Sequence, residues 1–220
     1  MKVIVFGATG MLGQGVLREC LLDDQIERVL TVGRTPTGRQ HPKLTELVRD
    51  DLTDFAPVED QLTGYEACFF CLGVSSTGMN EDAYRRVTYD ITVAAGQTLA
   101  RLNPGSTFVY VSGQGTDSTE RGRTMWARVK GRTENALLAM PLETYLFRPG
   151  YIQPMHGATS KTTLYRLLYR VTTPFYPVLR RVAPRHVTTT ERVGRAMINV
   201  AKTGAPQRIL ENPDINSVAG

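Results

Sequence analysis

The sequence has few cysteines and no long uncharged hydrophobic run. Its 220 residues include 3 cysteines, Cys20, Cys68 and Cys71. So few cysteines, in an odd number, exclude a disulfide scaffold and favour a reducing compartment. No stretch reaches the roughly 18 apolar residues of a membrane-spanning helix, and no signal-type segment precedes the first strand-like residues. We therefore expect a cytoplasmic protein without stable membrane insertion.

A metal site is also not expected. The 3 histidines, His41, His156 and His186, have no ligand-like spacing, and no carboxylate cluster accompanies them. Cys68 and Cys71 form a CxxC pattern, but an offset of three on a strand points the two side chains to opposite faces. We expect neither metal binding nor redox chemistry there.

The composition is that of a globular protein, with 41% hydrophobic and 21% charged residues, which excludes disorder. The net charge of +5 is uneven, because residues 161–195 carry eight basic side chains against Glu191 alone. This stretch could contact phosphates, a nucleic acid or an anionic membrane surface, or it could be a solvated helix face. Since the chain contains no recognised nucleic-acid-binding module, we expect no nucleic-acid partner.

Short β-rich runs alternate with helical patterns along the first 150 residues. This alternation predicts right-handed βαβ crossovers and an α/β fold with a Rossmann-type, doubly wound parallel sheet. The expected strands cover 2–7, 27–33, 44–52, 65–73, 106–113 and 143–150, and the expected helices 11–22, 80–102 and 124–140.

The pattern changes after residue 150. Residues 161–182 read as a helix with aromatics and prolines, which we expect to cover the substrate site. Thr188 and Glu191 have the spacing of a capping box, and Gly204 is typical of a helix end. We expect one domain over 1–220, in which 151–220 forms a small C-terminal helical part near the substrate.

The most specific motif is GATGMLG, in which Gly7, Gly10 and Gly13 lie between a strand and a helix. Gly7 permits a tight turn, Gly10 allows a pyrophosphate to approach the backbone, and Gly13 permits close packing of helix on strand. A purely structural glycine turn is the alternative. The residues expected to contact the cofactor here are Gly7, Thr9, Gly10, Met11, Leu12 and Gly13.

The end of the second expected strand bears on the choice of nucleotide. An NAD-specific site places a carboxylate there, whereas this chain has Arg34. A guanidinium can bind a 2′-phosphate in bidentate fashion, so NADP(H) is preferred over NAD(H). Arg34 could instead be a solvent-facing loop residue, and Arg39 is a second candidate.

The next strand ends supply further cofactor contacts. Asp51 suits the adenine amino group while Leu52 covers the ring face, although a turn aspartate could equally cap its own backbone. Small residues at the end of the following strand let the cofactor pass beside the backbone. The residues expected there are Cys71, Leu72 and Gly73.

These residues together resemble the short-chain dehydrogenase/reductase superfamily, in its atypical, epimerase-like NAD(P)-binding branch. GATGMLG, VGR, DDL, CLG, YVSG, VKG and FRPG occur in the expected order over nearly the whole chain. CLGVSS, EDAYRRVTYD, RVKGRTENAL and ILENPDI are similar to the Tat-interacting-protein group of oxidoreductase-like proteins. In this family the helices matching 80–102 and 124–140 commonly pair in dimers, so we expect a monomer or a homodimer.

The resemblance implies a catalytic tyrosine four residues before a lysine. Lys130 matches the lysine that binds the ribose, but Trp126 occupies the tyrosine position, and an indole cannot exchange a proton near neutral pH. Lys130 could also be simply one more charge on a basic helix. The standard proton donor is therefore missing.

The resemblance also assigns residues around the nicotinamide. Ser112 matches the serine that polarises a substrate carbonyl, or it caps a strand end, and Gln114 could act as an amide donor. Tyr151 is the nearest substitute acid, with packing in the cleft as its alternative. The segment expected to cover the nicotinamide is Pro149, Gly150, Tyr151 and Ile152, after Arg148.

Two functions follow from this interpretation. The first is an NADP(H)-dependent oxidoreductase of a small organic carbonyl or related substrate, with water or Tyr151 as proton source. The second, favoured by Trp126, is a non-catalytic NADP(H) sensor whose occupancy orders the C-terminal helices and changes partner binding.

Overall fold

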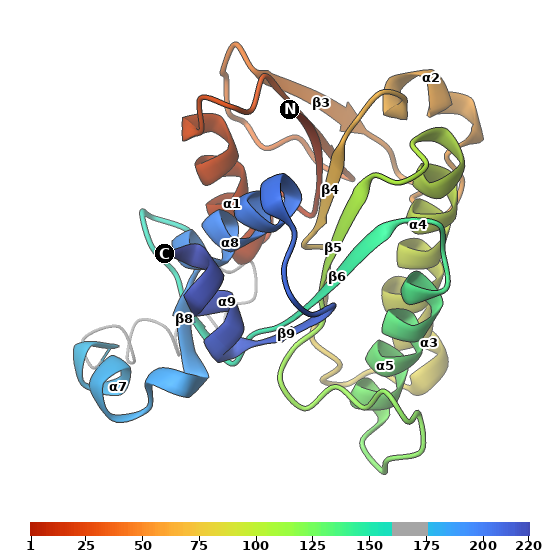
Figure 1. Cartoon of the computed structure of the whole chain (residues 1–220). Helices are drawn as coiled ribbons and strands as arrows, with labels where there is room; N and C mark the ends of the chain where they lie inside the picture. Colours follow the sequence, from red (N-terminus) through yellow and green to blue (C-terminus); the bar gives the residue numbers. More distant parts are fainter. Residues whose placement is uncertain (160–175) are drawn as a thin grey trace.

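A seven-stranded parallel sheet forms the centre of the molecule (Figure 1). The computed structural model describes residues 1–159 and 176–220. The strand order is β3-β2-β1-β4-β5-β6-β9, with every neighbouring pair parallel. This arrangement confirms the predicted doubly wound α/β sheet. The strands are β1 (Lys2–Phe6), β2 (Arg28–Gly33), β3 (Leu44–Val48), β4 (Ala67–Phe70), β5 (Thr107–Val111), β6 (Glu143–Arg148) and β9 (Ile209–Glu211).

Helices cover both faces of the sheet, so its strands are buried on both sides (Figure 1). Along β1, Val3 and Val5 pack in one core cluster, whereas Ile4 and Phe6 pack in the other. All four are at most 1% exposed, and each such burial stabilises the fold by about 1.5–3 kcal/mol. One face carries α1 (Met11–Leu22), α8 (Thr190–Thr203) and α9 (Asn212–Ala219), and the other α2 (Glu59–Leu62), α4 (Ile91–Leu102) and α5 (Met125–Leu138).

The helix predicted over 80–102 is interrupted. It consists of α3 (Glu81–Arg85), a π-helical turn over Arg86–Asp90, and α4. Its start agrees with the prediction, because the Asn80 side chain accepts a hydrogen bond from the Ala83 amide at 2.9 Å. A π-turn shifts the helical register without changing the apolar pattern enough to be read from sequence.

The C-terminal part both adds a small sheet and returns to the main one. β7 (Tyr151–Gln153) pairs in parallel with β8 (Val187–Thr189), while β9 pairs with β6. The N-cap of α8 is Thr189, which accepts from the Arg192 amide at 3.0 Å, so the capping box predicted from Thr188 is wrong by one residue. Gly204, with φ of 73°, ends α8 as predicted.

Most of the helix expected over 161–182 lies outside the described residues. Its last part is α7 (Tyr176–Val182), which leads into the short 3₁₀ turn Pro184–His186. The roof over the substrate site predicted for this segment therefore stays a prediction. None of the helices described is long and apolar enough to cross a membrane.

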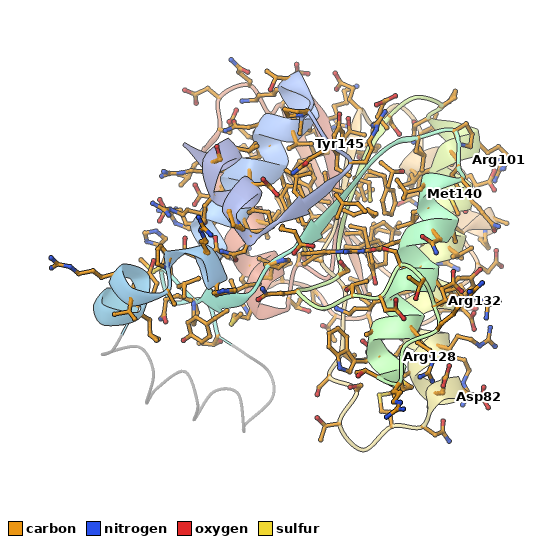
Figure 2. All side chains as sticks on the ribbon, turned by 60° about the horizontal axis from the view of Figure 1, so that its bottom comes forward. Asp82, Arg101, Arg128, Arg132, Met140 and Tyr145 are labelled. Carbon is orange, nitrogen blue, oxygen red and sulfur yellow. The ribbon has the colours of Figure 1, made fainter. Side chains whose placement is uncertain are left out.

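The arginines of α5 have partners within the chain. Arg128 forms an ion pair with Glu81 of α3 at 2.6 Å, and the Arg132 guanidinium lies 5.0 Å from the ring centroid of Tyr89. Figure 2 shows Arg128 and Arg132 on the outer surface of α5, with Asp82 of α3 nearby. These contacts tie α5 to the segment that precedes α4.

Candidate nucleotide-binding and active site

The glycine-rich loop between β1 and α1 is packed too tightly for side chains. Gly7 has a φ of 75°, and a Cβ atom there would lie 2.6 Å from the amide nitrogen of Leu72. A Cβ on Gly13 would lie 2.1 Å from the carbonyl oxygen of Gly7. The glycines thus allow β1, β4 and the first turn of α1 to meet closely.

The N-terminus of α1 has no side-chain cap. Its N-cap residue is Gly10, which accepts the first intrahelical hydrogen bond from Gln14 at 2.8 Å and has no side chain to cap the helix. Among the described residues, no N-cap side chain accepts a hydrogen bond from the first-turn amides of Met11, Leu12 and Gly13. Such a helix start, with its dipole, is suited to bind a phosphate.

Two hollows adjoin this loop. The larger, of about 290 Å³, is lined by Arg39 together with Ala8, Thr9, Gln14, Pro36 and Thr37. The smaller hollow reaches from Gly7 to Gly33 and to Glu46 of β3. Arg34 is exposed and does not line either hollow, so of the two predicted arginines it is Arg39 that borders the cavity.

Glu46 is an acid that the sequence reasoning missed at this place. It lies opposite Thr31 in the parallel register of β2 and β3. Its carboxylate accepts a hydrogen bond from the Thr37 amide at 2.7 Å and one from the Thr37 hydroxyl. The chain does bring a carboxylate to the end of β2, but from the neighbouring strand, and it holds the loop that follows β2.

Asp51 makes the local contacts expected of an aspartate that caps its own turn, which is the alternative given above. Its carboxylate accepts from both the amide and the hydroxyl of Thr53 at 2.7 Å, and these hydrogen bonds lower its pKa. Leu52 is 3% exposed and packs in the core beneath β3. The structure thus shows a turn-capping aspartate followed by a core leucine, and the adenine contact stays a prediction.

The end of β4 lies directly beside the glycine loop. The amide of Cys71 donates to the Phe6 carbonyl at 3.0 Å, and Gly73 has nothing within 4 Å of its Cβ position. Cys68 and Cys71 pack against opposite core clusters, as predicted from their spacing, and burial raises the pKa of both thiols. Among the described residues, no group of histidine, cysteine or acidic side chains could hold a metal ion.

Lys130 lies at the carboxyl end of β5. Its ammonium donates to the backbone carbonyl of Ser112, and it is 4.0 Å from the Cβ position of Gly113. Burial lowers the pKa of Lys130 to about 8, an effect that the nearby Glu134 carboxylate opposes. One turn earlier on α5, the half-buried Trp126 lies 3.6 Å from the Cβ position of Gly115.

Ser112 is oriented into the protein. Its hydroxyl donates to Glu134 at 2.5 Å and to the Phe147 carbonyl at 3.2 Å, and the residue is 4% exposed. Glu134 is fully buried and also binds the Arg148 guanidinium through Nε, at 3.0 Å, and Nη2. In this orientation the Ser112 hydroxyl supports Glu134, and the role toward a substrate carbonyl expected from the resemblance stays a prediction.

Gln114 meets a residue that the sequence reasoning did not place at the site. The backbone amide of Gln114 donates to the Pro149 carbonyl at 2.9 Å, and this hydrogen bond joins the ends of β5 and β6. Its side chain lies 3.0 Å from Nδ1 of His186, in the 3₁₀ turn before β8. A Cβ on Gly150 would lie 2.4 Å from the His186 carbonyl oxygen, so the C-terminal part crosses closely over this segment.

Tyr151, the expected substitute acid, donates its hydroxyl to Oε1 of Gln153 at 2.9 Å. Gln153 is 2% exposed. Ile152 is half-buried between them on the other face of β7. The Tyr151 hydroxyl is thus engaged with a buried amide in the structure.

Comparison with known proteins agrees with this fold. No family model matches the chain. Protein FMP52-2, mitochondrial, of Scheffersomyces stipitis is 25% identical, with 98% of this chain and 93% of that protein covered. Protein HTATIP2 of Rattus norvegicus is 24% identical over 69% of this chain and 62% of its own length. The homologues of the chain are thus HTATIP2 and FMP52 proteins, which confirms the resemblance to the Tat-interacting-protein group.

Solved structures share the architecture. The Bordetella bronchiseptica enzyme WbmF, in complex with NAD+, has a TM-score of 0.67 at 16% identity and covers 98% of this chain and 76% of its own. A UDP-N-acetylglucosamine 4-epimerase from Methanobrevibacter ruminantium has a TM-score of 0.70 at 14% identity, with 94% and 74% covered. At these identities the likeness establishes the fold, which is the Rossmann-like fold that the sequence predicted.

The cytoplasmic location expected from the sequence is wrong on this comparison. FMP52 proteins of Scheffersomyces stipitis, Emericella nidulans and Aspergillus niger are named as mitochondrial proteins. The scarcity of cysteine indicates reduced thiols and could not distinguish one reducing compartment from another.

Proposed function

We propose that this homologue of HTATIP2 and FMP52 proteins binds NADP(H) and acts as an oxidoreductase of a small organic substrate, with a non-standard active site. One observation carries the proposal. The uncapped start of α1 and the Lys130 ammonium both lie at the carboxyl edge of the same parallel sheet, where such folds bind their ligands. The solved complex of WbmF with NAD+ supports a pyridine dinucleotide as the ligand.

The residues suit the two ends of such a cofactor. The first-turn amides of α1 would bind the diphosphate, and Gly7 and Gly13 would keep the backbone close to it. Lys130 would donate to the nicotinamide ribose, with Leu72 and Gly73 beneath and Pro149 to Ile152 around the nicotinamide. Fully buried Glu134 would position this end through Ser112 and Arg148.

The reaction would be reduction of a carbonyl, or its reverse. The bound cofactor supplies a hydride, which comprises two electrons and one proton, to the carbonyl carbon. A proton donor of the protein, or water, delivers a second proton to the carbonyl oxygen, so that a ketone or aldehyde, NADPH and H⁺ give an alcohol and NADP⁺. Lys130 would orient the reactants, since its ammonium is fixed at the end of β5 by the Ser112 carbonyl.

The preference for NADP(H) rests on two loop arginines. Arg34 and Arg39 are both exposed, and Arg39 lines the hollow beside the glycine loop. Glu46 opposes this preference because a carboxylate close to the ribose would repel a 2′-phosphate. Its hydrogen bonds to Thr37 direct that charge into the loop, which leaves the arginines as the groups that face an incoming phosphate.

Calorimetric titration tests the cofactor assignment. We expect NADPH to bind more tightly than NADH, and Arg34→Ala or Arg39→Ala to weaken NADPH binding about tenfold or more, from loss of a charge-assisted contact of about 1.5–3 kcal/mol. Glu46→Gln is the matched control. It removes the carboxylate charge that would repel a 2′-phosphate, so it should increase the preference for NADPH over NADH. Equal losses for NADH and NADPH would contradict the arginine assignment, and no binding of either would overturn the proposed function.

A non-catalytic NADP(H) sensor is the second candidate, and Trp126 favours it. Gln14 connects the glycine loop to the C-terminal part, because its side chain donates to the carbonyls of Thr9 and Thr159, both at 3.1 Å. A sensor would therefore show slower amide exchange in α8 when NADPH binds, with no turnover of any carbonyl. Turnover by the wild-type protein, with unchanged exchange in α8, would exclude the sensor.

A further inference from the structure

His186 is held at the active-site end of the sheet by two independent contacts. Its ring nitrogen Nδ1 lies 3.0 Å from Nε2 and 3.3 Å from Oε1 of Gln114. Its backbone carbonyl lies against Gly150, where a side chain would come within 2.4 Å. The first contact fixes the imidazole and the second fixes the chain that carries it.

This position brings an imidazole and an ammonium to the same short turn. Lys130 binds the carbonyl of Ser112, and His186 binds the side chain of Gln114, two residues later. Gln114 is itself anchored to the Pro149 carbonyl at 2.9 Å, next to the segment assigned to the nicotinamide. The imidazole therefore borders the place where the hydride would be transferred.

Within the part of the chain that the structure describes, the proton donors considered above are engaged or unsuited to deliver a proton. Trp126 has an indole, which does not exchange its proton near neutral pH. The hydroxyl of Ser112 is turned to buried Glu134, and that of Tyr151 to buried Gln153. His186 is exposed, and its Nε2 has no hydrogen-bond partner among residues 1–159 and 176–220.

We propose that His186 is the proton donor that takes the place of the missing tyrosine, with Gln114 as the residue that orients its ring. The inference rests on the proposed oxidoreductase function. In reduction, the imidazolium gives the proton on Nε2 to the carbonyl oxygen as the carbon receives the hydride, and the neutral imidazole takes a new proton from water. Histidine is suited to this exchange because its charge changes near neutral pH.

NMR of the imidazole nitrogens tests this placement without any substrate. The chain has 3 histidines, so variants His41→Gln, His156→Gln and His186→Gln assign the signals. We expect the His186 signals to differ between the NADP⁺ and NADPH complexes, because the nicotinamide ring carries a positive charge only when oxidised. The adenosine bisphosphate half of NADPH, which lacks the nicotinamide, should leave them unchanged.

Turnover of 4-nitrobenzaldehyde with NADPH gives the second measurement. His186→Gln should lower turnover by about 100-fold or more without changing the affinity for NADPH, as expected for loss of a general acid. His156→Gln is the matched control, since His156 is also exposed and pairs with Glu191 at 2.9 Å. It should have wild-type turnover.

The outcomes separate the two proposals. If NADPH binds but the His186 signals are the same in both complexes, or His186→Gln turns over at the wild-type rate, the inference fails and the proposed function stands. If the wild-type protein binds no dinucleotide, the proposed function fails, and the inference with it.

Discussion

Replacing Glu134 with glutamine is expected to cost about 3 kcal/mol of unfolding free energy. Glu134 is fully buried, and its carboxylate accepts from Ser112 at 2.5 Å and from two nitrogens of Arg148. Glutamine has nearly the same shape and keeps one oxygen acceptor. Its amide group, however, faces an Arg148 nitrogen that can only donate, and the guanidinium, 12% exposed, loses its buried counter-charge.

The magnitude follows from burial. Removing one partner of a buried ion pair typically costs about 3–5 kcal/mol, and the hydrogen bonds that glutamine retains place this variant at the lower end. In a chain of this size the loss corresponds to a melting temperature lower by about 6–12 °C. Urea unfolding measures it as a lower midpoint with an unchanged slope.

Glu211→Gln is the matched control for the same arginine. Glu211 binds Arg148 at 3.4 Å but is 45% exposed, so its loss should cost less than about 1 kcal/mol. Equal destabilisation by the two variants, or a loss below about 1 kcal/mol for Glu134→Gln, would refute the argument from burial.

Four further predictions concern the nucleotide-binding and active site. Gly13→Ala should abolish NADPH binding in calorimetry, because the added Cβ would lie 2.1 Å from the Gly7 carbonyl oxygen, and NADPH binding with wild-type affinity by this variant would contradict the prediction. NADPH affinity should fall as pH rises through about 8, where the half-buried Lys130 loses its proton, and should not vary there in Lys130→Met. The same depressed pKa gives the opposite sign for stability: this group's contribution to the unfolding free energy rises between pH 8 and 10.5. Trp126→Tyr should raise turnover of 4-nitrobenzaldehyde about tenfold or more by supplying a second general acid, and unchanged turnover would argue that position 126 lies away from the substrate.

Most of the central sheet could be predicted from sequence, because its strands are short apolar runs bounded by glycine and polar residues. The alternation of Val3 and Val5 with Ile4 and Phe6 serves two cores at once. The π-turn over Arg86–Asp90 could not be predicted, since it shifts the helical register without a distinct change in the apolar pattern. The N-cap of α8 was misplaced because three threonines in succession offer equivalent caps.

Sequence patterns indicate the local geometry at a single strand end, but they do not show which distant segments meet there. The glycine elbow and Lys130 follow from local motifs. Glu46 reaches the end of β2 only through the β2–β3 register, and His186 reaches Gln114 across 72 residues of chain. The inward orientation of Ser112 depends on the buried Glu134. Nothing in the sequence distinguishes Glu134 from a surface charge on a basic helix.

The position of β9 bears on how the chain is synthesised. β6 pairs with β5 on one side and with β9 on the other, and β9 begins 61 residues after the end of β6, at Ile209. On the ribosome, the outer edge of β6 therefore stays open while some sixty residues are still being added. Until those residues are made, the open edge of β6 can pair with β9 of another nascent chain on the same polysome. Slow elongation over this stretch would therefore increase misassembly between neighbouring chains.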